Sequence, residues 1–94
     1  MDPYSSLAHN VTGQSYSGLG KFKQALQHYN FTIEQSKYHS DPHQQAETLN
    51  LKAQSLFNMG RVKNALECNA EAISLSPHNI VLYLDRAKMM IEME

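Results

Sequence analysis

One eight-residue phrase occurs twice in this chain of 94 residues, and it constrains the fold more than any other feature. Residues 19–26 read LGKFKQAL, and residues 59–66 read MGRVKNAL. The glycine, the basic residue after it, the lysine, the amide residue and the closing Ala-Leu recur forty positions apart. A period of roughly 20 to 50 residues indicates a stack of similar supersecondary units.

Start and stop signals divide the chain into helical segments. The prolines at positions 3, 42 and 77 each have a capping side chain beside them, which is typical of a first helical turn. The glycines around positions 20 and 60 are stop signals. Between these marks the apolar residues recur at steps of three and four, and no segment shows sustained strand alternation. We therefore predict an all-α fold with five helices over about 3–18, 21–37, 42–58, 61–75 and 79–93.

The repeated phrase then falls at the turn of a helical hairpin in each copy. Gly20 and Gly60 permit a positive φ that other residues adopt only under strain. Phe22 supplies an apolar plug just after the first turn. Ala25 and Ala65 allow the two helices of a hairpin to approach, because a larger side chain there would overpack the crossing. Each copy is thus predicted to be an antiparallel helix pair.

This pattern resembles the tetratricopeptide repeat family, whose repeat of about 34 residues is one helical hairpin. The resemblance covers nearly the whole chain as two and a half repeats, although Asn69 stands where the family has an aromatic residue. The matching positions are Gly13, Tyr16, Gly20, Phe22, Ala25 and Tyr29, then Leu49, Ala53, Leu56, Gly60, Ala65, Ala72 and Pro77, then Tyr83, Ala87 and Met90.

The resemblance implies one domain over residues 1–94, in which the hairpins stack into a right-handed superhelix. Repeat one covers about 6–39, repeat two about 46–79, and the first helix of a third repeat 80–94. The two turn glycines lie 40 residues apart rather than about 34. Because the extra six residues fall around 37–42, we expect the second helix of the first hairpin to be longer or its following loop wider.

The last predicted helix carries an apolar stripe without a hairpin partner. The stripe comprises Leu82, Tyr83, Ala87, Met90 and Ile91, and a third turn glycine would be due at position 94. Stacked repeats need a polar terminal helix to stay soluble. Two explanations are open: the chain is a piece of a longer array, or the last helix packs on a second molecule as a homodimer.

The resemblance also implies a partner-binding groove lined by the first helix of each hairpin. Carboxamides both donate and accept hydrogen bonds, so they suit the backbone of an extended peptide. The alternative is that these are merely polar residues on a wetted helix surface. The groove positions are Asn10, Gln14, Asn50, Gln54, Phe57, Asn58, Leu84 and Lys88.

The family's carboxylate clamp, which holds the C-terminus of a heat-shock chaperone, fits this chain poorly. The clamp needs a lysine on the first groove helix, where this chain has Asn10 and Gln14. On the third groove helix Lys88 has Leu84 one turn before it, and Arg86 would point differently. The missing cation removes the charge-assisted hydrogen bonds that make carboxylate capture strong, so only a weak chaperone-tail binder is an alternative.

Composition excludes several other classes of function. The net charge of −1, with both signs mixed along the chain, argues against a nucleic-acid surface. No run of residues is long and apolar enough for a membrane span. The start MDPYSSLAHN lacks a basic segment followed by an apolar stretch, so we expect no signal peptide and a cytoplasmic or nuclear protein. The single cysteine, Cys68, lies in a predicted amphipathic helix and is expected to pack rather than react.

The sequence carries no constellation for catalysis, a metal or a cofactor. His39 and His43 are four residues apart, but Pro42 breaks the helix that would align them. The other histidines, His9, His28 and His78, have no ligand partner at a known spacing. We predict a protein-interaction module or scaffold segment that is not an enzyme, with a helical subunit that self-associates through its last helix as the alternative.

Overall fold

A computed structural model describes residues 3–36 and 41–93, with side chains described over 8–35 and 41–93. It contains α1 (Pro3–Gly18), α2 (Phe22–Ser36), α3 (Pro42–Asn58), α4 (Val62–Leu75) and α5 (Ile80–Glu92). No strand occurs in the described residues. The all-α prediction is confirmed, and each predicted helix boundary lies within one residue of the observed one.

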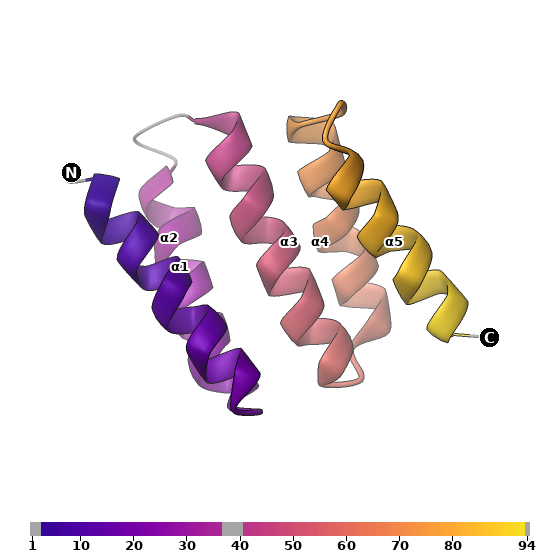
Figure 1. Cartoon of the computed structure of the whole chain (residues 1–94), viewed down its shortest axis with the longest axis horizontal. Helices are drawn as coiled ribbons and strands as arrows, with labels where there is room; N and C mark the ends of the chain where they lie inside the picture. Colours follow the sequence, from indigo (N-terminus) through magenta and orange to yellow (C-terminus); the bar gives the residue numbers. More distant parts are fainter. Residues whose placement is uncertain (1–2, 37–40, 94) are drawn as a thin grey trace.

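The helices form two layers (Figure 1). α1, α3 and α5 lie side by side in one layer, and α2 and α4 lie behind them. The closest packing is within the pairs α1–α2 and α3–α4, and α2 also packs on α3. The result is a flat stack that measures 42 × 30 × 17 Å, in which every first helix belongs to the same face.

The two hairpin turns have the same geometry. Gly20 has φ 79° and Gly60 has φ 84°, and they are the residues with positive φ in the described parts of the chain. After each turn, a backbone N–H donates back to the carbonyl of a residue five positions earlier: Lys21 to Tyr16 at 2.8 Å and Arg61 to Leu56 at 2.9 Å. A glycine in this conformation followed by such a bond terminates a helix without strain. The prediction that the repeated phrases are helix turns is confirmed.

The extra residues of the first period lie mostly at the start of α3. At a spacing of 34, Ile80 corresponds to Ala46, yet α3 begins four residues before Ala46, at Pro42. The Asp41 side chain caps this added turn and accepts from the backbone N–H groups of His43 and Gln44. α2, with 15 residues, is only one residue longer than α4. The expected lengthening of the second helix is therefore only one residue. The other alternative, a wider loop, concerns residues 37–40, which lie outside the described parts of the chain.

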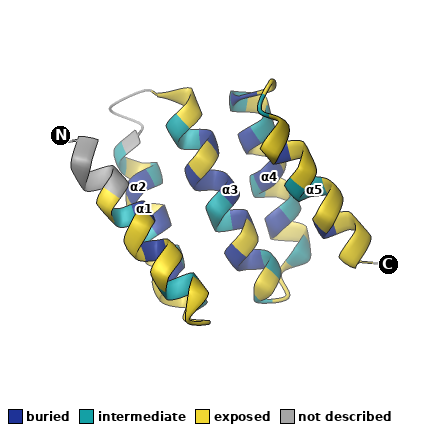
Figure 2. Cartoon of the chain, viewed as in Figure 1, coloured by how far each residue is buried: buried dark blue, intermediate teal, exposed yellow. Residues whose placement is uncertain are grey.

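The core lies at the helix crossings (Figure 2). One buried cluster joins α3, α4 and α5 through Ala46, Leu49, Ala72 and Leu82. A second joins the same helices through Ala53, Leu56, Ala65 and Met89. The alanines have no exposed surface, because the helix backbones approach most closely there. A larger side chain at such a crossing would push the helices apart.

At the point where the two helices of a hairpin cross, the two repeats have different pairs of residues in contact. In repeat one the fully buried ring of Tyr29 lies against Gly13, where an added Cβ would meet the ring Cε1 at 2.5 Å. Forty residues on, Ala53 and Asn69 occupy these positions and both are fully buried. The smaller amide leaves room for the alanine methyl group. Asn69 thus departs from the family's aromatic residue together with a compensating change, because Ala53 replaces the glycine that the larger ring requires.

The apolar stripe on α5 differs from the predicted one at Leu82, which is 1% exposed and packs against α3 and α4. Its inclusion was wrong because residues five apart on a helix, such as Leu82 and Ala87, point about 140° apart at about 100° per residue. Tyr83, Met90 and Ile91 are exposed, as predicted. Leu82 and Met89 are the buried residues of α5.

Candidate functional site

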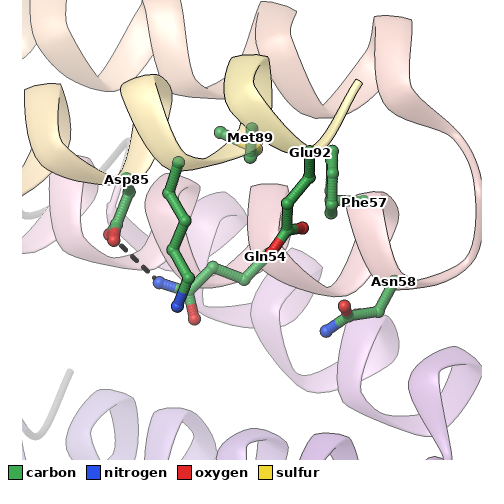
Figure 3. Close-up of a pocket in the computed structure, with 7 residues that line it drawn as sticks. Gln54, Phe57, Asn58, Asp85, Met89 and Glu92 are labelled. Carbon is green, nitrogen blue, oxygen red and sulfur yellow. Dashed lines mark hydrogen bonds between the residues drawn. The ribbon is translucent and has the colours of Figure 1, made fainter. Parts of the chain in front are cut away.

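A hollow of about 220 Å³ opens between α3 and α5, two neighbouring helices of the layer formed by the first helices. Figure 3 shows side chains from both helices around it. Four of the eight predicted groove residues line it, three from α3 and one from α5, so the structure brings half of the predicted set together. The lining residues are Gln54, Phe57, Asn58, Asp85, Lys88, Met89 and Glu92.

Asp85 is the anchor of this hollow. One of its carboxylate oxygens, Oδ2, accepts a hydrogen bond from Asn50 Nδ2 at 2.6 Å and another from Gln54 Nε2 at 3.2 Å. The second bond is the dashed line in Figure 3. Two amide donors on one turn of α3 therefore hold a carboxylate of α5. Bonds to an ionised acceptor are stronger than neutral ones, so they fix the two walls of the hollow relative to each other.

A second set of bonds extends from Asn50 to α4. The buried Asn69 Nδ2 donates to Asn50 Oδ1 at 3.4 Å and to the Leu82 carbonyl at 3.0 Å. Arg86 donates through one guanidinium nitrogen to Asn69 Oδ1 at 3.3 Å and to the Leu66 carbonyl at 3.4 Å. The guanidinium of Arg86 is thus bonded to α4 rather than directed into the hollow. A satisfied buried polar network of this kind favours one arrangement of the helices.

The remaining predicted groove residues are placed differently. Asn10 is 7% exposed and donates to Thr48 Oγ1 at 2.9 Å, and Asn50 is 6% exposed and bonded as above. Their amides therefore connect helices instead of facing solvent. Gln14 is exposed on α1, and Leu84 is exposed on α5 outside the lining set. That any of these residues contacts a partner remains a prediction.

Three lining residues were missed from the sequence: Asp85, Met89 and Glu92. With Lys88 they follow the spacing i, i+3, i+4 and i+7, which places them on one face of the predicted helix over 79–93. That face could have been found from the spacing. It was overlooked because the groove positions were transferred only from helix positions of the resembled family.

The described residues contain no group of three or more histidine, cysteine or acidic side chains arranged to hold a metal ion. His9 and His28 face each other with their Nδ1 atoms 2.9 Å apart, and His39 lies outside the described residues. Burial raises the pKa of the Cys68 thiol, and nearby Lys52 offsets this only partly. A protonated thiol packed against the core has little nucleophilic character.

A family profile described as tetratricopeptide repeat matches residues 46–79. The chain contains a tetratricopeptide repeat. This repeat consists of α4 and all of α3 except its first turn, so it supplies Gln54, Phe57 and Asn58 to the hollow. The other wall comes from α5, just beyond the matched residues. The hollow therefore forms where the tetratricopeptide repeat meets the next helix.

No solved structure matches the chain. Within the described ranges, no helix of the tetratricopeptide repeat or its neighbours combines the length and hydrophobicity needed to cross a bilayer. A tetratricopeptide repeat in general indicates a protein–protein interaction module, and the family is typically a non-enzymatic scaffold.

Proposed function

We propose that the chain is a protein-interaction module that receives a peptide segment of a partner in the hollow between α3 and α5. The observation that carries this proposal is the Asp85 anchor, which holds both walls in place before any ligand arrives. A preformed site loses less conformational entropy on binding than one that must be ordered.

The lining groups suit an extended peptide whose side chains carry little net charge. Gln54 uses its amide nitrogen on Asp85, which leaves its carbonyl oxygen to accept from a peptide N–H. Asn58 is exposed and can donate and accept. Phe57 supplies an apolar surface, and Lys88 and Glu92 place one charge of each sign at the rim. Such a site recognises backbone and shape more than charge.

A carboxylate clamp remains the weaker alternative. Lys88 is the one basic side chain among the residues that line the hollow, and Arg86 is bonded to α4. Capture of a C-terminal carboxylate at this place would rest on a single cation. We therefore propose an internal segment rather than a chaperone tail as the ligand.

Peptide display tests this proposal. A random peptide library is selected on the immobilised chain, and the enriched peptides are synthesised and titrated against isotope-labelled protein. We expect the side-chain amide resonances of Gln54 and Asn58 to shift, and the double variant Lys88→Glu/Asn58→Ala to weaken binding by about tenfold or more.

The matched control carries the same two changes on exposed residues of α4, Lys63→Glu/Asn64→Ala. It should bind the selected peptides as the wild type does. Peptides that bind both double variants equally, or that shift resonances only on other surfaces, would show that the hollow is not the binding site.

A further inference from the structure

The outward face of α5 repeats, position by position, a face that α3 buries. At the spacing of 34 residues, Leu49 corresponds to Tyr83 and Leu56 to Met90. In α3 both leucines are 5% exposed, because they pack in clusters with Ala72 and Ala65 of α4 and apolar side chains of α2 also pack against these clusters. In α5 the tyrosine is 46% and the methionine 50% exposed. Between them Ala53, fully buried, corresponds to Ala87, which is exposed.

The face on α5 is also more apolar than its counterpart. The buried Ala46 of α3 is replaced by Ile80, which is 70% exposed, and the polar Asn50 by Leu84. Ile91 extends the same stripe. We call these residues, Ile80, Tyr83, Leu84, Ala87, Met90 and Ile91, the α5 outer stripe. A contiguous exposed stripe of large apolar side chains marks an interaction surface.

The structure shows what kind of element covers such a face. On α3 the cover is α4, an antiparallel amphipathic helix whose Ala65 and Ala72 are fully buried at the contact. Small residues at these points allow close approach of the backbones. The same geometry on α5 calls for a helix with small residues one to two turns apart and an apolar stripe around them.

Charge specifies this helix further. Arg86 and Lys88 flank Ala87 at about 100° on either side, so a basic residue lies along each edge of the α5 outer stripe. On α3 the counterpart of Arg86 is Lys52, and it lines the same shallow depression as Glu67 of α4. A covering helix with an acidic residue at the matching place would face Arg86.

A second copy of α5 fits less well. In an antiparallel pair centred on Ala87, two-fold symmetry brings each edge of the stripe against the same edge of the other copy. Arg86 would then lie near its own symmetry mate, and Lys88 near its own, so both edges would repel. An acidic helix from a different molecule avoids this.

We propose that the α5 outer stripe is a second docking surface, distinct from the hollow, which binds an amphipathic helix of a partner protein. The bound helix has small residues at its centre and acidic residues along its edge. It lies antiparallel to α5, in the relation that α4 has to α3.

A peptide copied from α4 is a direct probe. The first probe has the sequence of residues 61–76, with both ends blocked and a fluorescent label. The second carries Asn69→Leu, because on α3 the Asn69 amide bonds to Asn50, and α5 offers Leu84 instead. Titration followed by fluorescence anisotropy should show the second probe binding about fivefold tighter or more, since a buried unpaired amide is costly.

Two alanine variants of the chain locate the binding. Ala87→Glu places a carboxylate at the centre of the α5 outer stripe, and it should weaken the second probe by about tenfold or more. Ala70→Glu makes the same change at an exposed alanine of α4 and should leave affinity within about twofold. Circular dichroism of both variants should match the wild type, because both alanines are exposed.

Three results would overturn the proposal. The first is absence of binding by either probe up to millimolar concentration. The second is binding that Ala87→Glu does not weaken. The third is a dimer of the chain alone, found by light scattering and abolished by Ala87→Glu, because that result would assign the stripe to a second copy.

Discussion

α3 and α5 are built to the same pattern, but α3 is covered on two sides and α5 on one. The side of α3 that faces repeat one carries Thr48 and Ser55, which bond to Asn10 and Ser17. The corresponding residues of α5 at the spacing of 34 are buried and apolar, Leu82 and Met89. The contact between α1 and α3 therefore includes hydrogen bonds between hydroxyl and amide side chains, and apolar packing on α3 comes from Ile33 and Leu26 of α2. In the contact between α3 and α5, the helix α5 itself supplies buried apolar side chains in addition to the polar network.

This difference shows which faces of the first helices are packed inside the stack and which stay exposed. A first helix in the stack has one face for the preceding hairpin and an opposite face for its own second helix. In α3 both are used for folding. In α5 only the face toward the preceding hairpin is packed against other helices. One edge of α5 completes the hollow with α3, and the opposite face remains apolar and exposed.

The largest expected contrast comes from a carboxylate placed at the two equivalent alanines. Ala53→Glu buries a charge in the joint between α3 and α4 and should lower the free energy of unfolding by about 4 kcal/mol or more. Ala87→Glu should change it by less than about 0.5 kcal/mol, because the new side chain points to solvent. Thermal unfolding followed by circular dichroism measures both. Similar losses in the two variants would show that Ala87 is covered in the same way as Ala53 and would contradict the predicted contrast.

A smaller contrast follows from shortening the large apolar residues. Leu56→Ala removes a buried side chain from a packed cluster and should cost about 2–5 kcal/mol. Met90→Ala, the corresponding change on the α5 outer stripe, should cost less than about 0.5 kcal/mol. Urea unfolding gives both values. An equal cost would mean that Met90 is covered in solution.

A third test exchanges the residue types at one pair of equivalent positions, Asn50 of α3 and Leu84 of α5. Asn50→Leu introduces the residue that α5 has, and it deprives Asp85 and the buried Asn69 of a partner. It should destabilise the fold by about 1–3 kcal/mol. The reverse exchange, Leu84→Asn, alters an exposed residue and should be neutral within about 0.5 kcal/mol. Urea midpoints of the two variants would decide, and a stabilised Asn50→Leu would be inconsistent with the network described.

The smallest expected effect is a pH dependence of the covered joint. Burial raises the pKa of Cys68 in the folded state above its ordinary value of 9.0. The neutral thiol is thus favoured by folding, and its contribution is complete below about pH 9 and is lost as the pH rises through the folded-state pKa. Between about pH 8 and pH 10.5 the urea midpoint of the wild type should fall more than that of Cys68→Ala. Parallel falls would show that the thiol is not desolvated.

The sequence was sufficient for the helices and turns because their signals are local. Pro42, Gly20 and Gly60 act through their own backbone geometry, so the boundaries could be placed within a residue. The start of α3 at Pro42 was predicted, but the extra residues of the first period were assigned to the end of α2 or its loop. A capping residue marks where a helix begins, but it does not show which of two neighbouring helices is longer than its counterpart in the other repeat.

The candidate site could be predicted only in part. The resemblance to the repeat family identified Gln54 and Lys88 as groove residues, and both line the hollow, but it could not show that Asp85 would accept a hydrogen bond from Asn50. The bonds from Asn50 and Gln54 to Asp85 join residues 35 and 31 positions apart in sequence, so they depend on the separation and tilt of α3 and α5. For the same reason Asn50, predicted to face a groove, is buried between α3, α4 and α5.

The central claim is that α5 leaves open the face that α3 buries, and thiol labelling tests it most directly. In a Cys68→Ala background, Ala53→Cys and Ala87→Cys place one thiol at each of the two equivalent positions. The account predicts that the thiol at position 87 reacts with a disulfide reagent about as fast as it does in urea, and the thiol at 53 at least about a hundredfold more slowly. Equal protection of both thiols in the native protein would contradict it.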